Sequence, residues 1–168
     1  MAERQDPAST DPDGQPESAR RPPGPAELRQ LDALVGKWHT SGVMRAAPGE
    51  APIRITGTDT YEWVAGGCFL AHWVDVWIGE ERVQAIEIIG GSDASRRGCP
   101  MRSFDSQGNF LTMYASVDAH GVWTFSDDSA RATLVISDDR SRMTGSWERT
   151  EDGESWLPWM DMEFTRAG

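Results

Sequence analysis

Ten short segments in which apolar and polar residues alternate follow one another from Gly36 onward, and no helical segment interrupts them. Alternation with period two is typical of strands that bury one face, and Gly-, Asp- and Ser-rich clusters of hairpin length separate the segments. Short links between successive strands favour an antiparallel meander, and closing a meander removes its exposed edges. The sequence therefore predicts an all-β, antiparallel up-and-down barrel of about ten strands. A two-sheet sandwich is the rival architecture, although its Greek-key crossings usually need longer connections. The segments are GKWHTSGVM, IRITGTDTYEW, CFLAHWVDVWI, RVQAIEIIG, MRSFD, NFLTMYASV, GVWTF, ARATLVIS, SRMTGSWERT and WLPWMDMEFT.

The first part of the chain has a different composition. Residues 1–24 are rich in Pro, Gly, Ser, Asp and Arg and almost lack large apolar side chains, which predicts a disordered tail. In PAELRQLDALVG, Pro25 suits a first helical position and leucines recur at helical spacing. We expect one short N-terminal helix that Gly36 ends, so that residues 25–168 form a single barrel domain.

Charge and cysteine content narrow the choice of partners and location. The net charge is −11, from 16 Lys and Arg against 27 Asp and Glu, and such a surface repels nucleic acid and anionic lipid. No segment approaches the roughly 18 consecutive apolar residues of a membrane helix, and the N-terminus does not resemble a secretory signal. Cys68 and Cys99 are expected to be free thiols in a cytoplasmic protein, with a bridge between them as the minority alternative.

Three motifs carry a resemblance to a known family. A short helix leading into GKW resembles the opening of the calycins, which include lipocalins, fatty-acid-binding proteins and nitrobindin-like barrels. The stretches LDALVGKWHTSG, TYEWVAGGCFLAHWVD, and IIGGSDAS with RSFDSQGN are similar to a bacterial lipocalin-like domain-of-unknown-function family over most of residues 28–166. The resemblance implies a barrel whose Trp38 plugs one end beside the helix. Nitrobindin-like proteins bind haem through a His near the C-terminus, but residues 147–168 contain no His, so we expect no haem and no other cofactor.

The stretch CFLAHWVDVW places His72 and Asp75 among large apolar residues. Because they are three positions apart in a strand, they should lie on opposite faces, which argues against a His–Asp dyad unless a bulge separates them. On the preceding segment, 53–63, the mainly apolar odd-numbered face includes Tyr61, with Asp59 as its polar exception, and this face should point inward.

The lengths of two links decide which way His72 points. A two-residue turn in VAGG pairs Tyr61 with the face that holds His72, whereas a three-residue loop would reverse this. A two-residue turn at Gly79-Glu80 pairs His72 with Glu87. Tyr61, His72 and Glu87 would then form one inward-facing row in which imidazole and carboxylate share a hydrogen bond. Such a pair could hold a ligand group or move a proton, so His72 and Glu87 are also the best catalytic candidates.

The opposite face of residues 69–78 would be unusually apolar. It should present Asp75 together with Trp73 and Trp77, next to Ile86 on the neighbouring strand. Patches of this kind usually mark a partner surface, so we predict a homodimer through Trp73, Trp77 and Ile86. A loop or the Pro-rich tail could cover the patch instead.

Other candidates would line the interior. If Gln107-Gly108 is a two-residue turn, Arg102 faces inward with Met113 and meets Glu87 or a ligand carboxylate, as in fatty-acid-binding relatives. An exposed Arg102 or a wall salt bridge is an equal alternative. Large aromatic and adaptable Met side chains suit a cavity, although any single one suits ordinary core equally well. The predicted ligand-binding set is Trp38, Tyr61, Trp63, His72, Glu87, Arg102, Met113, Trp147 and Met160.

The leading hypothesis is binding of a small, largely apolar ligand in the barrel. The alternatives are a cofactor-free isomerase or cyclase that uses His72 and Glu87, and a dimeric interaction module with a filled barrel. Metal binding is not expected, because His39, His72 and His120 lack ligand-like spacing. Neither a G-x-S-x-G nucleophile motif nor a glycine-rich phosphate loop occurs.

Overall fold

Ten antiparallel strands form the domain, as expected from the alternating pattern. The computed structural model describes residues 26–47, 49–91 and 98–168; the tail predicted over residues 1–24 and the helical start at Pro25 lie outside them. The strands are β1 (Gly36–Met44), β2 (Ile53–Trp63), β3 (Phe69–Ile78), β4 (Glu81–Gly90), β5 (Cys99–Asp105), β6 (Phe110–Val117), β7 (Trp123–Ser126), β8 (Ala130–Ile136), β9 (Arg142–Arg149) and β10 (Leu157–Arg166).

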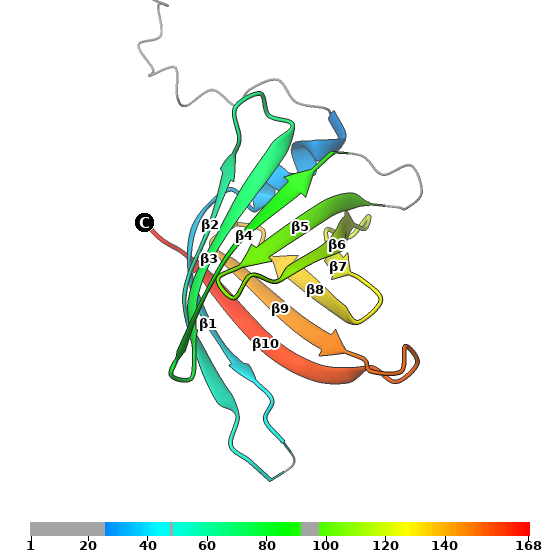
Figure 1. Cartoon of the computed structure of the whole chain (residues 1–168). Helices are drawn as coiled ribbons and strands as arrows, with labels where there is room; N and C mark the ends of the chain where they lie inside the picture. Colours follow the sequence, from blue (N-terminus) through cyan, green and yellow to red (C-terminus); the bar gives the residue numbers. More distant parts are fainter. Residues whose placement is uncertain (1–25, 48, 92–97) are drawn as a thin grey trace, which may run out of the picture.

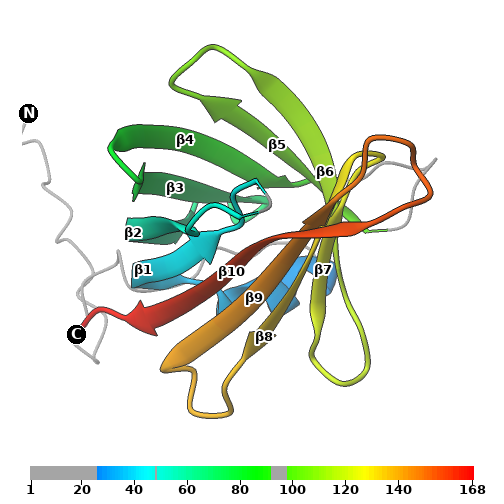
Figure 2. The same ribbon diagram turned by 90° about the horizontal axis from the view of Figure 1, so that it is seen from below.

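The strands close on themselves in chain order. Each pairs with its sequence neighbours, and β1 pairs with both β2 and β10, which completes the ring (Figure 1). Closure leaves no unpaired strand edge in the ring, so the expected up-and-down barrel is confirmed and the sandwich is not formed. The same ring is viewed from below in Figure 2.

A short helix covers one end of the barrel. It is the 3-10 helix η2 (Ala26–Ala33), which lies at the end of the barrel where β4 finishes (Figure 1). Leu28, Leu31 and Leu34 are buried against the strands, and Gly36, expected to end the helix, instead opens β1 with a φ of 130°. Trp38 is fully buried beside this helix, and its indole N–H donates to the carbonyl of Leu34 at 2.8 Å.

Two hairpins have the register that was predicted from link parity. Tyr61 lies opposite His72 across β2 and β3, and His72 lies opposite Glu87 across β3 and β4. The second hairpin turns at Gly79-Glu80, where Gly79 has a φ of 63° that favours glycine. The inward-facing row Tyr61–His72–Glu87 is therefore confirmed as a feature of the fold.

The β5–β6 hairpin differs from its prediction. Its loop has three residues, 106–108, because the Asp105 N–H donates to the carbonyl of Asn109 while the Asp105 carboxylate accepts from the backbone N–H groups of Gln107 and Asn109. One added residue in the loop reverses the parity of the strand pair. The inward direction predicted for Arg102 is consequently wrong.

Candidate functional site

The barrel encloses a cavity of about 240 Å³. The exposure of the inward-facing side chains rises with distance from η2. Leu70 and Ile89, near the helix, are fully buried, whereas Ile78, Val83 and Met160 are half-buried. The mouth therefore lies at the end opposite the helix. Thirteen of the lining residues are apolar, namely Ile55, Val74, Val76, Ile78, Val83, Met101, Met113, Phe125, Leu134, Trp147, Met160, Met162 and Phe164; the other four are Asp59, Tyr61, His72 and Glu87.

The four polar residues gather on one side of the cavity, on β2, β3 and β4. His72 lies between two carboxylates: its Nδ1 is 2.6 Å from Oε2 of Glu87, and its Nε2 is 2.7 Å from Oδ1 of Asp59. The side chains of His72, Asp59 and Glu87 are 9%, 5% and 17% exposed, so this is a buried charge cluster. The sheet builds it, because Glu87 is directly opposite His72 while Asp59 is its diagonal neighbour on β2.

Thr40 supports the cluster from β1. Its hydroxyl donates to Oδ2 of Asp59, so both carboxylate oxygens of this buried residue have a partner. Thr40 and Asp59 are each 4% exposed. Burying a carboxyl group without hydrogen bonds would be costly, so Thr40 offsets part of the cost of placing Asp59 inside the barrel. Sequence reasoning missed Thr40 altogether and noted Asp59 only as an exception on an apolar face.

The environment fixes the protonation state of His72. Burial alone would lower the pKa of its imidazole, but the negative charge of Glu87 and the hydrogen bonds to Asp59 and Glu87 outweigh burial and raise the pKa to about 9. At neutral pH the ring is therefore an imidazolium that donates from both nitrogens. Burial, and then the charges of Asp59 and Glu87, raise the pKa of Tyr61 well above its usual value, so that phenol stays neutral.

The arrangement decides which polar groups a bound molecule can reach. Both nitrogens of His72 are engaged, and Tyr61 stacks on the ring with centroids 3.8 Å apart and planes inclined by 9°. Within the described part of the chain, Oε1 of Glu87 accepts no hydrogen bond, although Glu87 lines the cavity. Glu87 is therefore the acidic side chain with an oxygen available to a ligand, and His72 is the group that orients it.

The predicted site residues divide into two groups. Tyr61, His72, Glu87, Met113, Trp147 and Met160 all line the cavity. Trp38 is core at the helical end, and the Trp63 indole N–H donates to Asp32 of η2 at 2.8 Å; neither tryptophan is among the lining residues. These two side chains anchor the helix to the barrel.

Arg102 lies outside the barrel, contrary to the prediction. It is exposed on β5, while its neighbours Met101 and Ser103 are buried. Phe104, which was expected to share its inward face, is 46% exposed. No Lys or Arg is among the described residues that line the cavity, so the anchor proposed for a ligand carboxylate is missing.

A glycine on β9 makes room for one wall of the cavity. A Cβ added at Gly145 would lie 2.6 Å from Cζ3 and 2.9 Å from Cη2 of Trp147, which shows that the indole folds over this position. Met162 on β10 lies directly opposite Gly145 and also lines the cavity. Adaptable Met side chains and a flat indole thus form the wall that faces the charge cluster.

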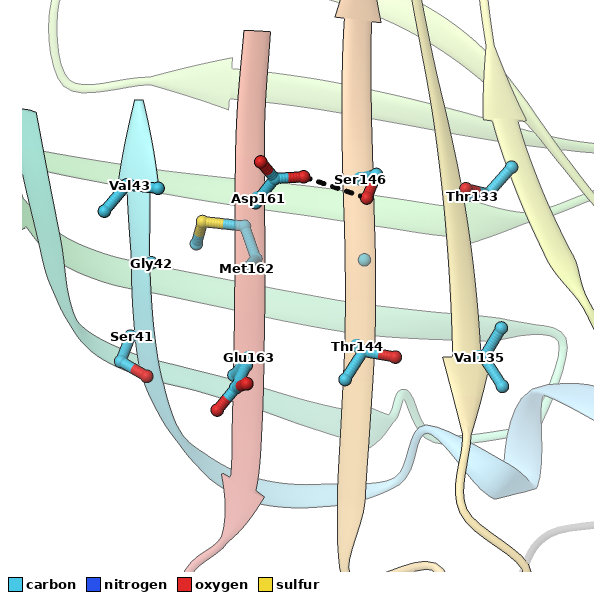
Figure 3. Close-up of a pocket in the computed structure, with 11 residues that line it drawn as sticks. Ser41, Gly42, Val43, Thr133, Val135, Thr144, Ser146, Asp161, Met162 and Glu163 are labelled. Atoms are coloured by element: carbon cyan, nitrogen blue, oxygen red, sulfur yellow. Dashed lines mark hydrogen bonds between the residues drawn. The ribbon is translucent and has the colours of Figure 1, made fainter. Parts of the chain in front are cut away.

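A second, larger hollow lies on the outer face of β8, β9, β10 and β1 (Figure 3). Four hydroxyl-bearing side chains and two glycines line it, together with Val43, Val135, Met162, Asp161 and Glu163. Asp161 is already engaged, because it accepts from Ser146 at 3.0 Å and pairs with Arg45 at 3.2 Å (Figure 3 shows the contact with Ser146). Because this hollow is open and Asp161 is paired, we take the enclosed cavity as the candidate site.

The opposite outer face carries aromatic side chains. Trp73 on β3, Ile86 on β4, Phe104 on β5 and Phe110 on β6 are paired in succession, and we call them the outer aromatic belt. Trp73, Phe104 and Phe110 are 50%, 46% and 60% exposed, and Trp77 lies farther along β3. The outward direction predicted for Trp73 and Trp77 is confirmed, and the belt extends beyond the predicted patch.

Asp75 shares this outer face, where it forms two hydrogen bonds with Arg82, at 2.9 and 2.8 Å. It is thus separated from His72, as expected from their spacing, and a different aspartate, Asp59, partners the imidazole.

Among the described residues, no group of three His, Cys, Asp or Glu side chains is arranged to hold a metal ion. None of the described helices has the length and apolarity needed to cross a bilayer.

Comparison with known proteins places the fold but not a family. No protein-family model matches the chain, and no curated protein does. Among solved structures, the crystal structure of Rv2717c from M. tuberculosis has a TM-score of 0.61 at 14% identity, covering 86% of this chain and 99% of that one. A structure of EF1p2_mFAP2b bound to DFHBI has a TM-score of 0.46 at 8% identity, covering 84% and 100%. At such identities the first likeness concerns the fold alone.

Proposed function

We propose that this protein binds a small, largely apolar molecule inside the barrel. The observation that carries the proposal is the cavity of about 240 Å³, in which thirteen apolar side chains face four convergent polar ones. Ligand sites typically combine apolar walls with a few placed polar groups, and a volume just below their usual range of about 300–1,000 Å³ suits a small ligand. An interior packed solid, as in the interaction-module alternative, would not leave this space.

The state of His72 favours binding over acid–base catalysis. A general base needs an unprotonated nitrogen within reach of the substrate. Both nitrogens of His72 face carboxylates, and its raised pKa of about 9 keeps it protonated at neutral pH. The alternative of an isomerase that uses His72 as base therefore has less support than a binding site in which His72 orders Glu87.

Two further proposals concern kinship and location. The short helix that leads into GKW, with Trp38 fully buried beside it, supports a calycin-like barrel. Cys68 and Cys99 are free thiols, which supports a cytoplasmic location because thiols persist in reducing compartments.

The outer aromatic belt supports the predicted homodimer. A second copy of the chain is the proposed occupant, because Arg82 pairs with Asp75 between Trp73 and Trp77 and so leaves no unpaired carboxylate beside these two side chains on an acidic protein. Two such faces can approach each other without the carboxylate repulsion expected elsewhere on the acidic surface.

Methionine-methyl NMR tests ligand binding at the site itself. Four of the seven methionines line the cavity, namely Met101, Met113, Met160 and Met162, while Met44 and Met143 do not. With methyl-labelled methionine, a panel of small apolar molecules that each carry one polar group should shift the four cavity signals saturably. The signals of Met44 and Met143 should move little.

A cavity-filling variant provides the control. Val83 is half-buried near the mouth, so Val83→Phe should abolish the saturable shifts while the protein stays folded. Equal shifts at all the methionines, or no saturable shift with any molecule of the panel, would refute the proposed function.

A further inference from the structure

We propose that the ligand of this cavity is a small amine with an apolar body, bound as its ammonium ion, rather than a carboxylate. This inference rests on the proposed binding function and adds the chemical class of the ligand. It reverses the expectation from fatty-acid-binding relatives, in which an inward arginine would meet an acid.

The charges that face the cavity do not balance. Asp59 and Glu87 contribute two carboxylates, and the imidazolium of His72 contributes one positive charge, which leaves one excess negative charge. The neighbouring strands do not compensate, because β1 contributes the hydroxyl of Thr40 and β5 the buried hydroxyl of Ser103. No Lys or Arg is among the described lining residues. A cation would restore neutrality in this desolvated space.

The excess charge can be assigned to one group. Asp59 is held by Thr40 and His72, so both of its oxygens are occupied. Glu87 gives Oε2 to His72, while Oε1 has no hydrogen-bond partner in the described chain. An ammonium group donates hydrogen bonds and carries charge, so it satisfies this oxygen in both respects. The neutral phenol of Tyr61 lines the same side and offers a further acceptor oxygen.

A carboxylate ligand faces the opposite situation. It would lose its hydration inside an apolar space and meet Glu87 and Asp59 without an available cation, because both N–H groups of His72 are already donated. Buried like charges disfavour each other strongly. The cavity should therefore reject anions that have the same shape as the accepted amine.

The apolar walls indicate the rest of the ligand. Phe125, Phe164 and Trp147 lie among the lining residues, with Met side chains that adapt to flat rings. A volume of about 240 Å³ corresponds to about eight water molecules at about 30 Å³ each. One aromatic ring with a short amine-bearing chain fits this space.

Three probes of nearly equal shape separate the contributions of charge and shape. Phenethylamine, phenylethanol and phenylacetate are titrated at neutral pH into the methyl-labelled protein, and the Met113 and Met160 signals are followed. We expect phenethylamine to bind at least about tenfold more tightly than phenylethanol, and phenylacetate to give no saturable shift. Phenylethanol that binds as tightly as the amine, or preferred binding of phenylacetate, would overturn the inference and leave the proposed function standing. If none of the three shifts these signals while another molecule of the panel does, the inference is overturned and the proposed function stands; if no molecule of the panel shifts them, both fail.

Glu87→Gln tests the assignment of the charge. It keeps the shape of the side chain and removes its negative charge, so the preference for phenethylamine over phenylethanol should fall to within about twofold. Glu163→Gln on the outer face of β10 is the matched control and should preserve the preference. A full amine preference that persists in folded Glu87→Gln would show that another group selects the cation and would overturn the proposal.

Discussion

Tyr61 lies flat against the imidazole of His72, with ring centroids 3.8 Å apart and an angle of 9° between the planes. The electron-rich face of a phenol attracts a cation, and the imidazole is held as a cation by the carboxylates at its two nitrogens. Tyr61 therefore covers the face of the ring while Asp59 and Glu87 occupy its edge. Together they leave His72 without a free nitrogen.

Replacing the stacked ring should destabilise the protein. In Tyr61→Leu the imidazolium loses its aromatic neighbour, and the free energy of unfolding at neutral pH should fall by about 1–2 kcal/mol. Tyr61→Phe keeps the ring and should cost less than half as much. Urea titrations of both variants measure the difference, and equal losses would show that the hydroxyl, not the stacking, matters.

Stability should depend on pH through His72. Its pKa is raised from about 6.5 in the unfolded chain to about 9 in the barrel, so the native state binds the proton more tightly. The resulting stabilisation is complete below about pH 6.5 and is lost as the pH rises to about 9, amounting to about 3 kcal/mol. Urea unfolding across this interval measures the slope.

The variant His72→Gln is the control for this pH dependence. It should be less stable at neutral pH by about 3 kcal/mol, because Asp59 and Glu87 lose their compensating charge. Its stability should change much less between pH 6.5 and 9 than that of the wild type. An unchanged slope in the variant would assign the pH dependence to other groups.

Thr40 should matter more than an ordinary strand threonine. Thr40→Val preserves the shape of the side chain but removes the donor to Asp59, so we expect a loss of about 1–3 kcal/mol in the free energy of unfolding. Thr144→Val on the exposed face of β9 is the matched control and should change stability by less than about 0.5 kcal/mol. Similar effects of the two substitutions would indicate that Asp59 does not depend on Thr40.

Gly145 should control the size of the cavity. Adding a methyl group in Gly145→Ala pushes the Trp147 indole, which lies within 2.6 Å of the new Cβ position, away from its present place. Overpacking of this kind costs about 1–3 kcal/mol and should weaken ligand binding measured by methyl NMR. Ser146→Ala, on the outer face of the same strand, should leave binding unchanged.

The outer aromatic belt predicts a dimer that one substitution can dissolve. Trp73→Ser should convert a dimer into a monomer in analytical ultracentrifugation, because it removes the largest exposed side chain of the belt. Val135→Ser changes a similarly exposed residue on the other side of the barrel and should leave the dimer intact. A wild-type protein that sediments as a monomer would refute the dimer.

The parity of short links made part of the site predictable from the sequence. The glycine-containing turns before and after β3 are of even length, so the row Tyr61–His72–Glu87 could be derived without coordinates. The same reasoning failed at the next hairpin, where Arg102 was placed inside. The signal was present, because Asp105 followed three residues later by Gly108 is typical of a type I turn, which here lengthens the loop to three residues.

Diagonal contacts and cavity volume were less accessible to sequence reasoning. Pairing rules identify directly opposed residues, whereas the contact of Asp59 with His72 and that of Thr40 with Asp59 are diagonal and depend on side-chain reach. Trp38 and Trp147 look alike in an alternating pattern, yet one fills the core and the other lines the cavity. The packing of Trp38 beside η2 and of Trp147 over Gly145 distinguishes them.

Nitrogen-15 NMR of the His72 imidazole tests most directly the claim that the ring is a clamped cation that presents Glu87 to a ligand. Both ring nitrogens should be protonated at neutral pH, and the ring should lose one of its two protons only near pH 9. A bare nitrogen at neutral pH, or a transition near the ordinary histidine value of about 6.5, would contradict the account.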